Sequence, residues 1–559
     1  MTAENTSVAP PPAGLLANPR LFPTLSAAQI ARMTARGRRR TTASREILVE
    51  PGSRPVPLFL VVSGGLQIVS ATGPTTTILN LDPGQFSGET NMMTGRPALA
   101  RTEVREPGEL IELDREAVLA LIQTDAELGE ILMRTFILRR VELISRGIGD
   151  AVLIGSTHCA GTLRAKEFLT RNGHPHTFID LDREADAQEL LDRFHVTPAD
   201  VPVLICRGDL ILRNPTNARI AECLGLNAGV EPTHLRDLVV VGAGPAGLAA
   251  AVYGASEGLD VLVLESDAPG GQAGTSSRIE NYLGFPTGIS GPDLTGRAQA
   301  QALKFGAQIL IARRATQLAC ARQPYAVVTE DGSRVSARAI VIATGVQYRR
   351  LAIPNLAQFE GAGVYYAATA MEAQLCGGDE VIVVGGGNSA GQAAVFLAQT
   401  TRHVHVLVRS AGLADTMSRY LIRRIEDNPA ITLHTQTEIT ALEGNGHLER
   451  VSWTDATGTA ETRNIRHVFM MTGAVPHTEW LHGCVALDDK GFIKTGPDLS
   501  QEDLAAAGWP LSRAPYLLET SRPGVFAVGD ARRGNIKRVA SAVGEGSISI
   551  AFVHQLLSS

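Results

Sequence analysis

The chain has 559 residues, of which 44% are hydrophobic and 19% are charged, and its formal net charge at pH 7 is -6. Such a length holds roughly three to five domains, and this balance of residues is typical of packed domains rather than of disorder. The small negative charge gives no reason to expect nucleic acid or an anionic membrane as a partner.

The first twenty residues have neither a basic start nor an apolar stretch of signal-peptide length. Elsewhere no apolar run approaches the roughly 20 residues that a membrane helix needs. We therefore predict a cytoplasmic protein without a membrane partner, in which residues 1–20 are a disordered start.

Residues 21–149 alternate short β-patterned runs with Gly/Pro turns, and a helical stretch closes the segment. Runs such as LFLVVSGGLQIVS and GELIELDREAVLALIQ indicate strands that end at turns. The segment resembles the cyclic-nucleotide-binding domains, which are β jelly rolls with flanking helices. The landmarks that carry this resemblance are Gly64, Gly84, Gly88 and Glu89.

In that family a glutamate binds the ribose, and an arginine about nine residues later binds the cyclic phosphate. Glu89 fills the first position, but Ala98 stands at the second, with Arg96 and Arg101 on either side as substitutes. Because a buried phosphate without a cation is poorly balanced, the sequence argues against a cyclic nucleotide as the ligand. We expect the fold to serve dimerisation or docking instead. No helix-turn-helix pattern follows, so DNA binding is not predicted.

Residues 150–228 form a second segment whose pattern has the order βαβαββα. AVLIG and HTFIDLD read as strands, EADAQELLDRF as a helix, and ADVPVLIC with GDLILRN as a hairpin. This order resembles the thioredoxin and glutaredoxin domains, in which the active cysteine precedes the first helix and a cis-proline faces it. Cys159 and the Val201–Pro202 bond occupy those two positions.

Cys159 is the candidate redox thiol, because a helix start stabilises a thiolate and a protonated His158 would add to that effect. A CxxC pair would need a second cysteine where Thr162 stands. None of the six cysteines lies three residues from another, so the local sequence predicts neither a dithiol nor a metal site. Two interpretations stay open: Cys159 is redox-active, or it is inert in a domain kept for docking.

The strongest motif lies between Asp237 and Ser266, where a strand, a G-x-G-x-x-G loop, an Ala-rich helix and a second strand follow one another. Gly242 allows the tight turn, Gly244 admits a pyrophosphate to the backbone, and Gly247 lets helix and strand pack closely. The helix start offers free N–H groups to phosphates, and Glu265, about 20 residues on, suits a ribose. This segment is predicted to bind a dinucleotide.

A second unit of the same kind runs from Asp379 to Ser410, with Gly385, Gly387 and Ala390 at the three small positions. Its second strand ends at Arg409 rather than at an acid. A cation there suits a 2′-phosphate, which favours NADPH over NADH. The alternative is that Arg409 is a solvated strand end.

Four further motifs follow in order: APGGQAG, IENYLGFP, AIVIATG and, near the end, RPGVFAVGD. With the two glycine loops, they make the chain from about Leu238 onward similar to the low-molecular-weight bacterial thioredoxin reductases. The resemblance implies a homodimeric flavoprotein that uses FAD and NADPH. It also implies an NAD(P)H-binding domain at 351–473, inserted between two parts of an FAD-binding domain at 229–350 and 474–559.

Site residues are carried over from the family by position. For FAD they are Gly242, Gly244, Pro245, Ala246, Gly247, Glu265, Gly271, Gln272, Asn281, Thr344, Gly345, Gly529, Asp530 and Arg538. For NADPH they are Gly385, Gly387, Asn388, Ser389, Ala390 and Arg409.

The family's segment before the second glycine loop carries a CxxC that takes electrons from the flavin and passes them to thioredoxin. Here the segment reads GVYYAATAMEAQLCGG, with Ala367 and Ala370 at the cysteine positions. A methyl group forms neither a disulfide nor a thiolate, so the family's usual route is closed. Cys376 lies nearby and is interpreted as a packing residue.

The sequence thus predicts a multidomain chain: a β jelly roll, an α/β thioredoxin-like fold and two Rossmann-like α/β dinucleotide-binding domains. Its predicted activity is hydride transfer from NADPH to FAD and onward to a redox protein or a small-molecule acceptor, with Cys159 as a candidate route to a disulfide. Two alternatives remain. One is a ferredoxin- or flavodoxin-NADP reductase-like enzyme, which uses the same scaffold without the cysteines. The other is a flavin/NADPH redox sensor regulated through the N-terminal domain.

Overall fold

The computed structural model describes residues 21–558, except 71–76, 90, 146–148, 158, 183–199, 208–209, 228, 230–233, 277 and 350. The chain forms two compact units, the first comprising Met1–Gly155 and Asn172–Ala228, the second Ser156–Arg171 and Gly229–Ser559. Three expectations lie outside the described residues: the disordered start at 1–20, the helix at 184–194 and the role of His158.

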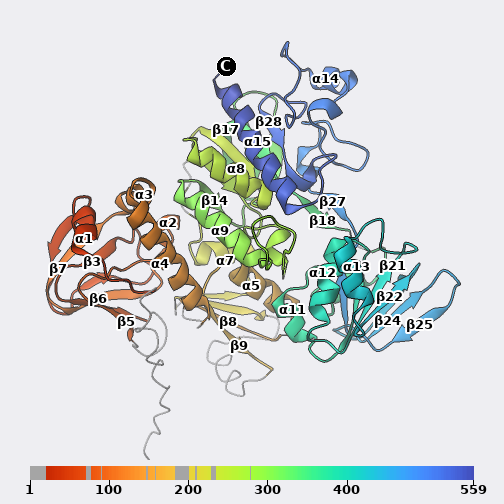
Figure 1. Ribbon diagram of the computed structural model, residues 1–559, viewed down its shortest axis with the longest axis horizontal. Helices are drawn as coiled ribbons and strands as arrows, with labels where there is room; N and C mark the ends of the chain where they lie inside the picture. Colours follow the sequence, from red (N-terminus) through yellow and green to blue (C-terminus); the bar gives the residue numbers. More distant parts are fainter. Residues whose placement is uncertain are drawn as a thin grey trace, which may run out of the picture. The chain divides into compact units, whose positions relative to one another are not determined.

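The first unit opens with two antiparallel sheets (Figure 1). One sheet has the order β1 (Arg38–Thr41), β7 (Glu109–Leu113) and β3 (Leu58–Val61), and the other β2 (Ile47–Val49), β6 (Arg101–Glu106), β4 (Gly65–Val69) and β5 (Thr77–Leu81). Both contribute to one core, in which Phe59, Leu66 and Val104 are buried. The helices are α1 (Ala27–Thr34), α2 (Asn91–Thr94), α3 (Arg115–Thr124) and α4 (Ala126–Ser145). This is the predicted jelly roll with flanking helices.

Gly64 shows why a glycine is needed at the turn between β3 and β4. Its φ of +78° favours glycine, and an added Cβ would lie 2.5 Å from the carbonyl oxygen of Glu106. The turn at Gly64 therefore requires glycine because of its backbone conformation and its close contact with Glu106.

The first unit continues with a four-stranded sheet of order β11 (Leu210–Arg213), β10 (Val203–Cys206), β8 (Ala151–Gly155) and β9 (His176–Asp180). β8 and β9 are parallel, whereas β10 is antiparallel to both of its neighbours, so the predicted hairpin is confirmed. Helix α7 (Asn217–Cys223) follows, capped by the Thr216 side chain. The Val201–Pro202 bond is cis, and Cys206 forms a disulfide with Cys223.

The second unit contains a seven-stranded sheet. Its strands are β14 (Gln308–Leu310), β13 (Val261–Leu264), β12 (Arg236–Val241), β17 (Arg334–Ile342), β16 (Tyr325–Thr329) and β15 (Ala315–Ala319), with β28 (Val525–Ala527) beside β17. The strands β14, β13, β12, β17 and β28 pair in parallel, and β13 and β28 consist only of buried apolar residues, as is usual in parallel sheets. The helices that belong to this part are α8 (Pro245–Ser256), α9 (Gly291–Lys304), α14 (Gln501–Ala507) and α15 (Val539–Leu557).

Two distant parts of the chain complete this domain. β28 pairs with β17, and α15 packs on α8 (Figure 1). At the crossing an added Cβ on Gly546 would lie 2.2 Å from the carbonyl oxygen of Ala246, so only glycine permits this approach. A disulfide between Cys320 and Cys484 also joins the two parts.

The inserted segment forms a parallel sheet of order β19 (Val364–Tyr365), β26 (His467–Met470), β20 (Glu380–Val384), β21 (His403–Val408) and β22 (Ile431–Thr435). Its helices are α10 (Leu356–Phe359), α11 (Ala370–Leu375), α12 (Asn388–Leu397) and α13 (Arg419–Glu426), and β23 (Glu438–Glu443), β24 (Arg450–Thr454) and β25 (Ala460–Arg463) form a small antiparallel sheet. The chain enters and leaves through the paired strands β18 (Val346–Tyr348) and β27 (Ala474–Pro476). The second unit thus contains two Rossmann-type domains.

Among the helices of the described residues, none combines the length and the apolar character that crossing a membrane requires.

Candidate functional site

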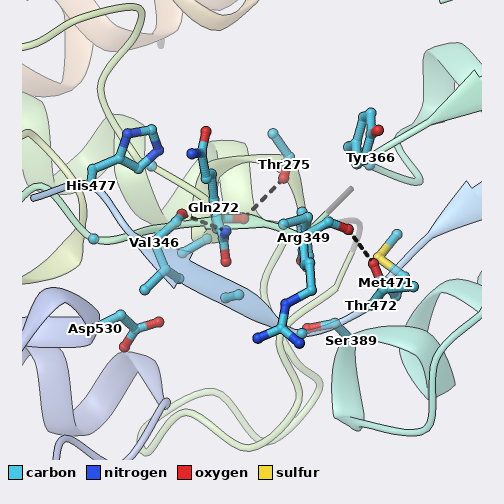
Figure 2. Close-up of a pocket in the computed structure, with 18 of the residues that line it drawn as sticks. Gln272, Thr275, Val346, Arg349, Tyr366, Ser389, Met471, Thr472, His477 and Asp530 are labelled. Atoms are coloured by element: carbon cyan, nitrogen blue, oxygen red, sulfur yellow. Dashed lines mark hydrogen bonds between the residues drawn. The ribbon is translucent and has the colours of Figure 1, made fainter. Parts of the chain in front are cut away.

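A cavity of about 2370 Å³ in the second unit is lined by both glycine loops. Figure 2 shows part of its wall, with Gln272, His477 and Asp530 on one side and Ser389 and Tyr366 on the other. The two predicted dinucleotide sites therefore open into one space.

The first glycine loop joins β12 to α8, and its three glycines have different tasks. An added Cβ on Gly242, whose φ is +104°, would lie 2.4 Å from the carbonyl oxygen of Ala343. On Gly247 it would lie 1.9 Å from the carbonyl oxygen of Gly242. These two glycines are required by the packing of the protein itself.

Gly244 is different, because the protein leaves room beside it. As the N-cap of α8 it has φ -70° and ψ -177°, a conformation open to any residue, and an added Cβ would meet nothing nearer than the Cα of Gly271 at 4.0 Å. The absence of a side chain thus keeps open a space next to the free N–H groups of a helix start. That space fits the pyrophosphate of a dinucleotide.

The second glycine loop repeats this design between β20 and α12. Gly385, with φ +138°, has no room for a Cβ, which would lie 2.3 Å from the carbonyl oxygen of Met471. Gly387 has φ -93° and ψ 177°, and an added Cβ there would meet nothing nearer than the carbonyl oxygen of Thr416 at 4.0 Å. The space beside Gly387, at the start of α12, again fits a phosphate of a dinucleotide.

Glu265 at the end of β13 fastens the first loop. Its carboxylate accepts hydrogen bonds from the backbone N–H groups of Ala243 at 2.7 Å and Asp267 at 2.9 Å. Burial raises the pKa of this carboxyl group, and the two N–H donors act against that rise. The predicted ribose ligand is therefore also a positioning group for the loop.

The C-terminal part of the first domain brings Asp530 to the cavity. The N–H of Gly529 donates to Glu545 at 2.7 Å, which fixes the turn after β28. Burial raises the pKa of Asp530. Arg538, the N-cap of α15, lies on the same wall.

Two hydrogen bonds brace the crossing between the domains. The Gln272 amide donates to the carbonyl oxygen of Val346 at 2.8 Å, and the Thr344 hydroxyl donates to that of His477 at 2.8 Å. Burial, aided by Arg314, lowers the pKa of His477, so its imidazole is neutral at pH 7. His477 lies on the cavity wall (Figure 2), and no local motif in the sequence marked it.

Most of the predicted cofactor residues line this cavity. Those that do are Gly242, Gly244, Pro245, Ala246, Glu265, Gly271, Gln272, Asn281, Thr344, Gly345, Gly529, Asp530, Arg538, Gly385, Gly387, Asn388, Ser389 and Arg409. Gly247 and Ala390 are not among the lining residues; both are buried where helix meets strand.

Helix α5 (Ala160–Arg171) is an unexpected part of the wall, to which it contributes Ala160, Gly161, Leu163, Arg164, Glu167 and Arg171. The Arg171 guanidinium lies 3.1 Å from the Asp267 carboxylate and donates to the carbonyl oxygen of Gly271 at 3.3 Å. At the other end of the helix, the methyl group of Ala160 would lie 3.1 Å from a Cβ on Gly361. α5 therefore packs against both inserted and flanking domains.

The two cysteines outside the disulfides differ sharply. Cys376 is fully buried, its thiol donates to the carbonyl oxygen of Glu372 at 2.9 Å, and burial raises its pKa to about 12. This agrees with its interpretation as a packing residue. Cys159 is half-buried and directly precedes α5; it is not itself a lining residue, whereas the next two residues are. On the other side, Ala367 lines the cavity where the family would place a thiol.

Comparison with known proteins agrees with this geometry. Residues 236–546 match the family model described as pyridine nucleotide-disulphide oxidoreductase, and residues 39–125 match the cyclic nucleotide-binding domain. NADPH-dependent thioredoxin reductase 3 of Arabidopsis thaliana is 31% identical over 63% of this chain and 66% of its own. Thioredoxin reductase of Mycolicibacterium smegmatis is 33% identical over 56% of this chain and 93% of its own.

Among solved structures, thioredoxin reductase of Lactococcus lactis in its FR conformation superposes with a TM-score of 0.52 at 26% identity. The match covers 58% of this chain and 99% of that one. The chain therefore belongs to the pyridine nucleotide-disulphide oxidoreductase family, as a thioredoxin-reductase-like flavoprotein oxidoreductase that uses FAD and NADPH.

Proposed function

We propose that FAD lies along the loop before α8 and NADPH along the loop before α12, held by the residues carried over from the family. The observation that supports this most directly is the room beside Gly244 and Gly387, two glycines whose backbone conformation does not require glycine. When bound, the two cofactors supply hydride transfer, and the protein supplies their placement and the exclusion of water.

Arg409 is proposed to select NADPH. It directly follows β21, its side chain is 74% exposed, and its guanidinium approaches only Glu438, at 3.8 Å, among the ion pairs recorded for the described residues. We expect Arg409→Gln to raise the KM for NADPH about thirtyfold and leave that for NADH unchanged, because a charge-assisted contact to the 2′-phosphate is lost. Arg402→Gln, at the opposite end of the same strand, is the control. An unchanged NADPH/NADH preference would mean that Arg409 is only a solvated strand end.

For the route out of the flavin we propose Cys159. The segment that carries a dithiol in the family has Ala367 and Ala370, whereas the helix that follows Cys159 lines the cofactor cavity. We also propose that residues 150–228 are a thioredoxin-like domain, on the strength of the strand order β9-β8-β10-β11 and the position of Cys159 before α5.

The proposed step reduces a disulfide between Cys159 and a small thiol. The S–S bond breaks, NADPH is oxidised to NADP⁺, and two electrons and two protons, one of them from solvent, give the Cys159 thiol and a free small thiol. The chain's part is to present the sulfur at the start of α5, next to the cavity wall.

The test is Cys159→Ser. Turnover of NADPH with a low-molecular-weight disulfide should fall at least about a hundredfold, while reduction of the flavin by NADPH in stopped flow stays at the wild-type rate. In the wild type, iodoacetamide should label Cys159 and leave the buried Cys376 unmodified. Undiminished disulfide turnover in the variant would exclude Cys159 from the path.

A second candidate is transfer to an external acceptor such as a ferredoxin, a flavodoxin or a quinone. This candidate is favoured because Cys159 is not among the residues that line the cofactor cavity, although the next two residues are. Assaying the same variant with these acceptors separates the two: rapid turnover independent of Cys159 would identify the ferredoxin-NADP reductase-like activity.

Three features of organisation are also proposals. They are the domain boundaries expected from the sequence, a homodimer, and a cytoplasmic location. The location needs its own measurement, because the two disulfides are more usual in oxidising compartments. Thiol counting on protein extracted under rapid alkylation would show whether they form in the cell.

A further inference from the structure

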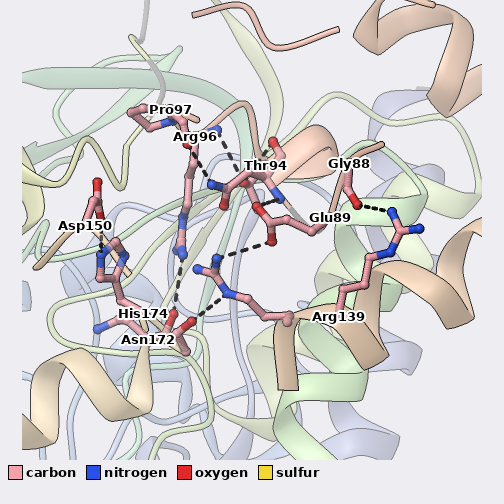
Figure 3. A network of polar contacts seen from close by, with 12 residues as sticks. Gly88, Glu89, Thr94, Arg96, Pro97, Arg139, Asp150, Asn172 and His174 are labelled. Carbon is pink, nitrogen blue, oxygen red and sulfur yellow. Dashed lines mark hydrogen bonds and ion pairs between the residues drawn. The ribbon is translucent and has the colours of Figure 1, made fainter. Parts of the chain in front are cut away.

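Three arginines of the N-terminal jelly roll and its helix α4 bind main-chain carbonyl oxygens of the following segment, all within the first unit. Arg96 donates to Asn172 at 3.4 Å and Arg140 to Gly173 at 2.7 Å (Figure 3). Arg54 donates to the carbonyl oxygens of Gly225 and, at 3.3 Å, Asn227.

These carbonyl groups share a structural position, because each belongs to the turn that follows a helix. α5 ends at Arg171 and α7 at Cys223, and the glycines two residues on, Gly173 and Gly225, have φ of +58° and +59°. That left-handed glycine is the usual end of a helix, where carbonyl groups lack partners and the dipole is negative. Arginine side chains complement both features.

The side chains of Arg96 and Arg140 are buried, and Glu89 supplies a carboxylate beside them. Arg140 also pairs with Glu89 at 3.2 Å, and the two side chains are only 9% and 16% exposed. Arg96 is buried as well, and its burial lowers its pKa to about 9. Beside this cluster His174 bonds to Asp150 at 2.9 Å, with both side chains 2% exposed. Breaking such contacts leaves buried polar groups without partners, so they hold the turn firmly.

The same side chains are those that the sequence offered to a cyclic nucleotide. Glu89 was the expected ribose ligand, and it is paired with Arg140. Of the two substitutes for the missing phosphate ligand, Arg96 points to Asn172 and Arg101 pairs with Glu50 at 2.9 Å. Ala98, at the phosphate position itself, is buried and uncharged.

The cavity inside the jelly roll supports the same conclusion. It measures about 140 Å³ and is lined mainly by apolar side chains, with Arg139 as the cation among its lining residues. The Arg139 guanidinium donates to the carbonyl oxygens of Leu21 at 2.9 Å and Gly88 at 2.7 Å, between the rings of Phe22 and Phe86. Two of the three guanidinium nitrogens of Arg139 are thus already bonded, and a cyclic phosphate placed here would meet no second cation among the described lining residues.

We propose that the region expected to bind a nucleotide is an intramolecular docking site: Arg96 and Arg140, the latter paired with Glu89, bind the turn Asn172–His174, and a cyclic nucleotide is not the ligand. The partner is thus the turn Asn172–His174 of the same unit, recognised by guanidinium groups through its main-chain carbonyl oxygens.

The first experiment is hydrogen exchange on the full, FAD-loaded chain carrying Arg140→Ala. Amides of residues 172–176 should exchange at least about tenfold faster than in the wild type, because the turn loses its main anchor. The matched control is Arg134→Ala in the same helix α4, where the Arg134 side chain is 63% exposed and pairs only with Glu130 among the recorded ion pairs. It should leave exchange unchanged.

Glu89→Gln keeps the proposal testable if Arg140→Ala does not fold. It removes the ion pair but keeps the shape, and exchange at 172–176 should rise about threefold or more. Calorimetry of the wild type with cyclic AMP and with cyclic GMP should give no binding heat. Unchanged exchange in the folded variants, or micromolar binding of either nucleotide to the wild type, would overturn the proposal.

Discussion

Gly244→Val is expected to give a folded protein that cannot hold flavin. The extended conformation at this N-cap accepts valine, including before Pro245, and the protein has no atom within 4 Å to clash with a Cβ other than the Cα of Gly271 at 4.0 Å. The new side chain would instead fill the space proposed for the pyrophosphate. We expect FAD affinity to fall at least about a hundredfold, or roughly 3 kcal/mol, measured by flavin retention and reconstitution.

The control for this change is Gly296→Val. Gly296 lies exposed on α9 of the same domain, and a Cβ there meets nothing within 4 Å. That variant should stay yellow with an unchanged melting temperature. A yellow Gly244→Val protein with wild-type FAD affinity would show that the pyrophosphate does not lie at the start of α8.

Gly387→Val should keep its flavin and lose reduction by NADPH. Its backbone also accepts valine, and the side chain would project into the space proposed for the phosphates of NADPH. We expect the apparent Kd for NADPH in stopped-flow reduction to rise at least about a hundredfold, whereas dithionite still reduces the flavin. This split between the two cofactors is the result that assigns each loop to its dinucleotide.

Gly377→Val serves as the matched change in the inserted domain, since Gly377 is exposed and lies outside the cavity wall. NADPH should reduce it at the wild-type rate. Loss of flavin in Gly387→Val, with NADPH affinity retained, would reverse the assignment of the loops.

The dinucleotide loops could be predicted from the sequence because their chemistry is local. A strand, three small residues and a helix start follow one another within a dozen residues. The packing of the protein requires Gly242 and Gly247, and the open space beside Gly244 accounts for the third glycine. The fold brings the two loops to one cavity, which the sequence did not predict, but the residues that each loop contributes were predicted from the sequence.

The contribution of α5 could not be predicted in this way. Arg171 meets Asp267 and Gly271, about a hundred residues away, and no pattern in either stretch marks the pairing. The disulfides show the same limit, since Cys206 and Cys223, or Cys320 and Cys484, come together only through the fold. Spacing rules detect neighbours along a helix or a loop and are silent about contacts between elements.

The cassette of the jelly roll shows a subtler difference. The sequence singled out Glu89 and Arg96 as candidate nucleotide ligands, and in the structure their partners are Arg140 and the carbonyl oxygen of Asn172. A residue at a family position does not by itself reveal its partner, because the fold decides which groups lie beside it.

The pairing of β28 with β17 has a consequence for biogenesis. The final strand, and α15 with it, leaves the ribosome only after the whole inserted domain has been made. Until then the sheet beside β17 is incomplete, and Asp530 and Arg538 are missing from the wall. Insertion of the prosthetic group must therefore await the synthesis of β28 and α15, whereas the N-terminal unit can fold while synthesis continues.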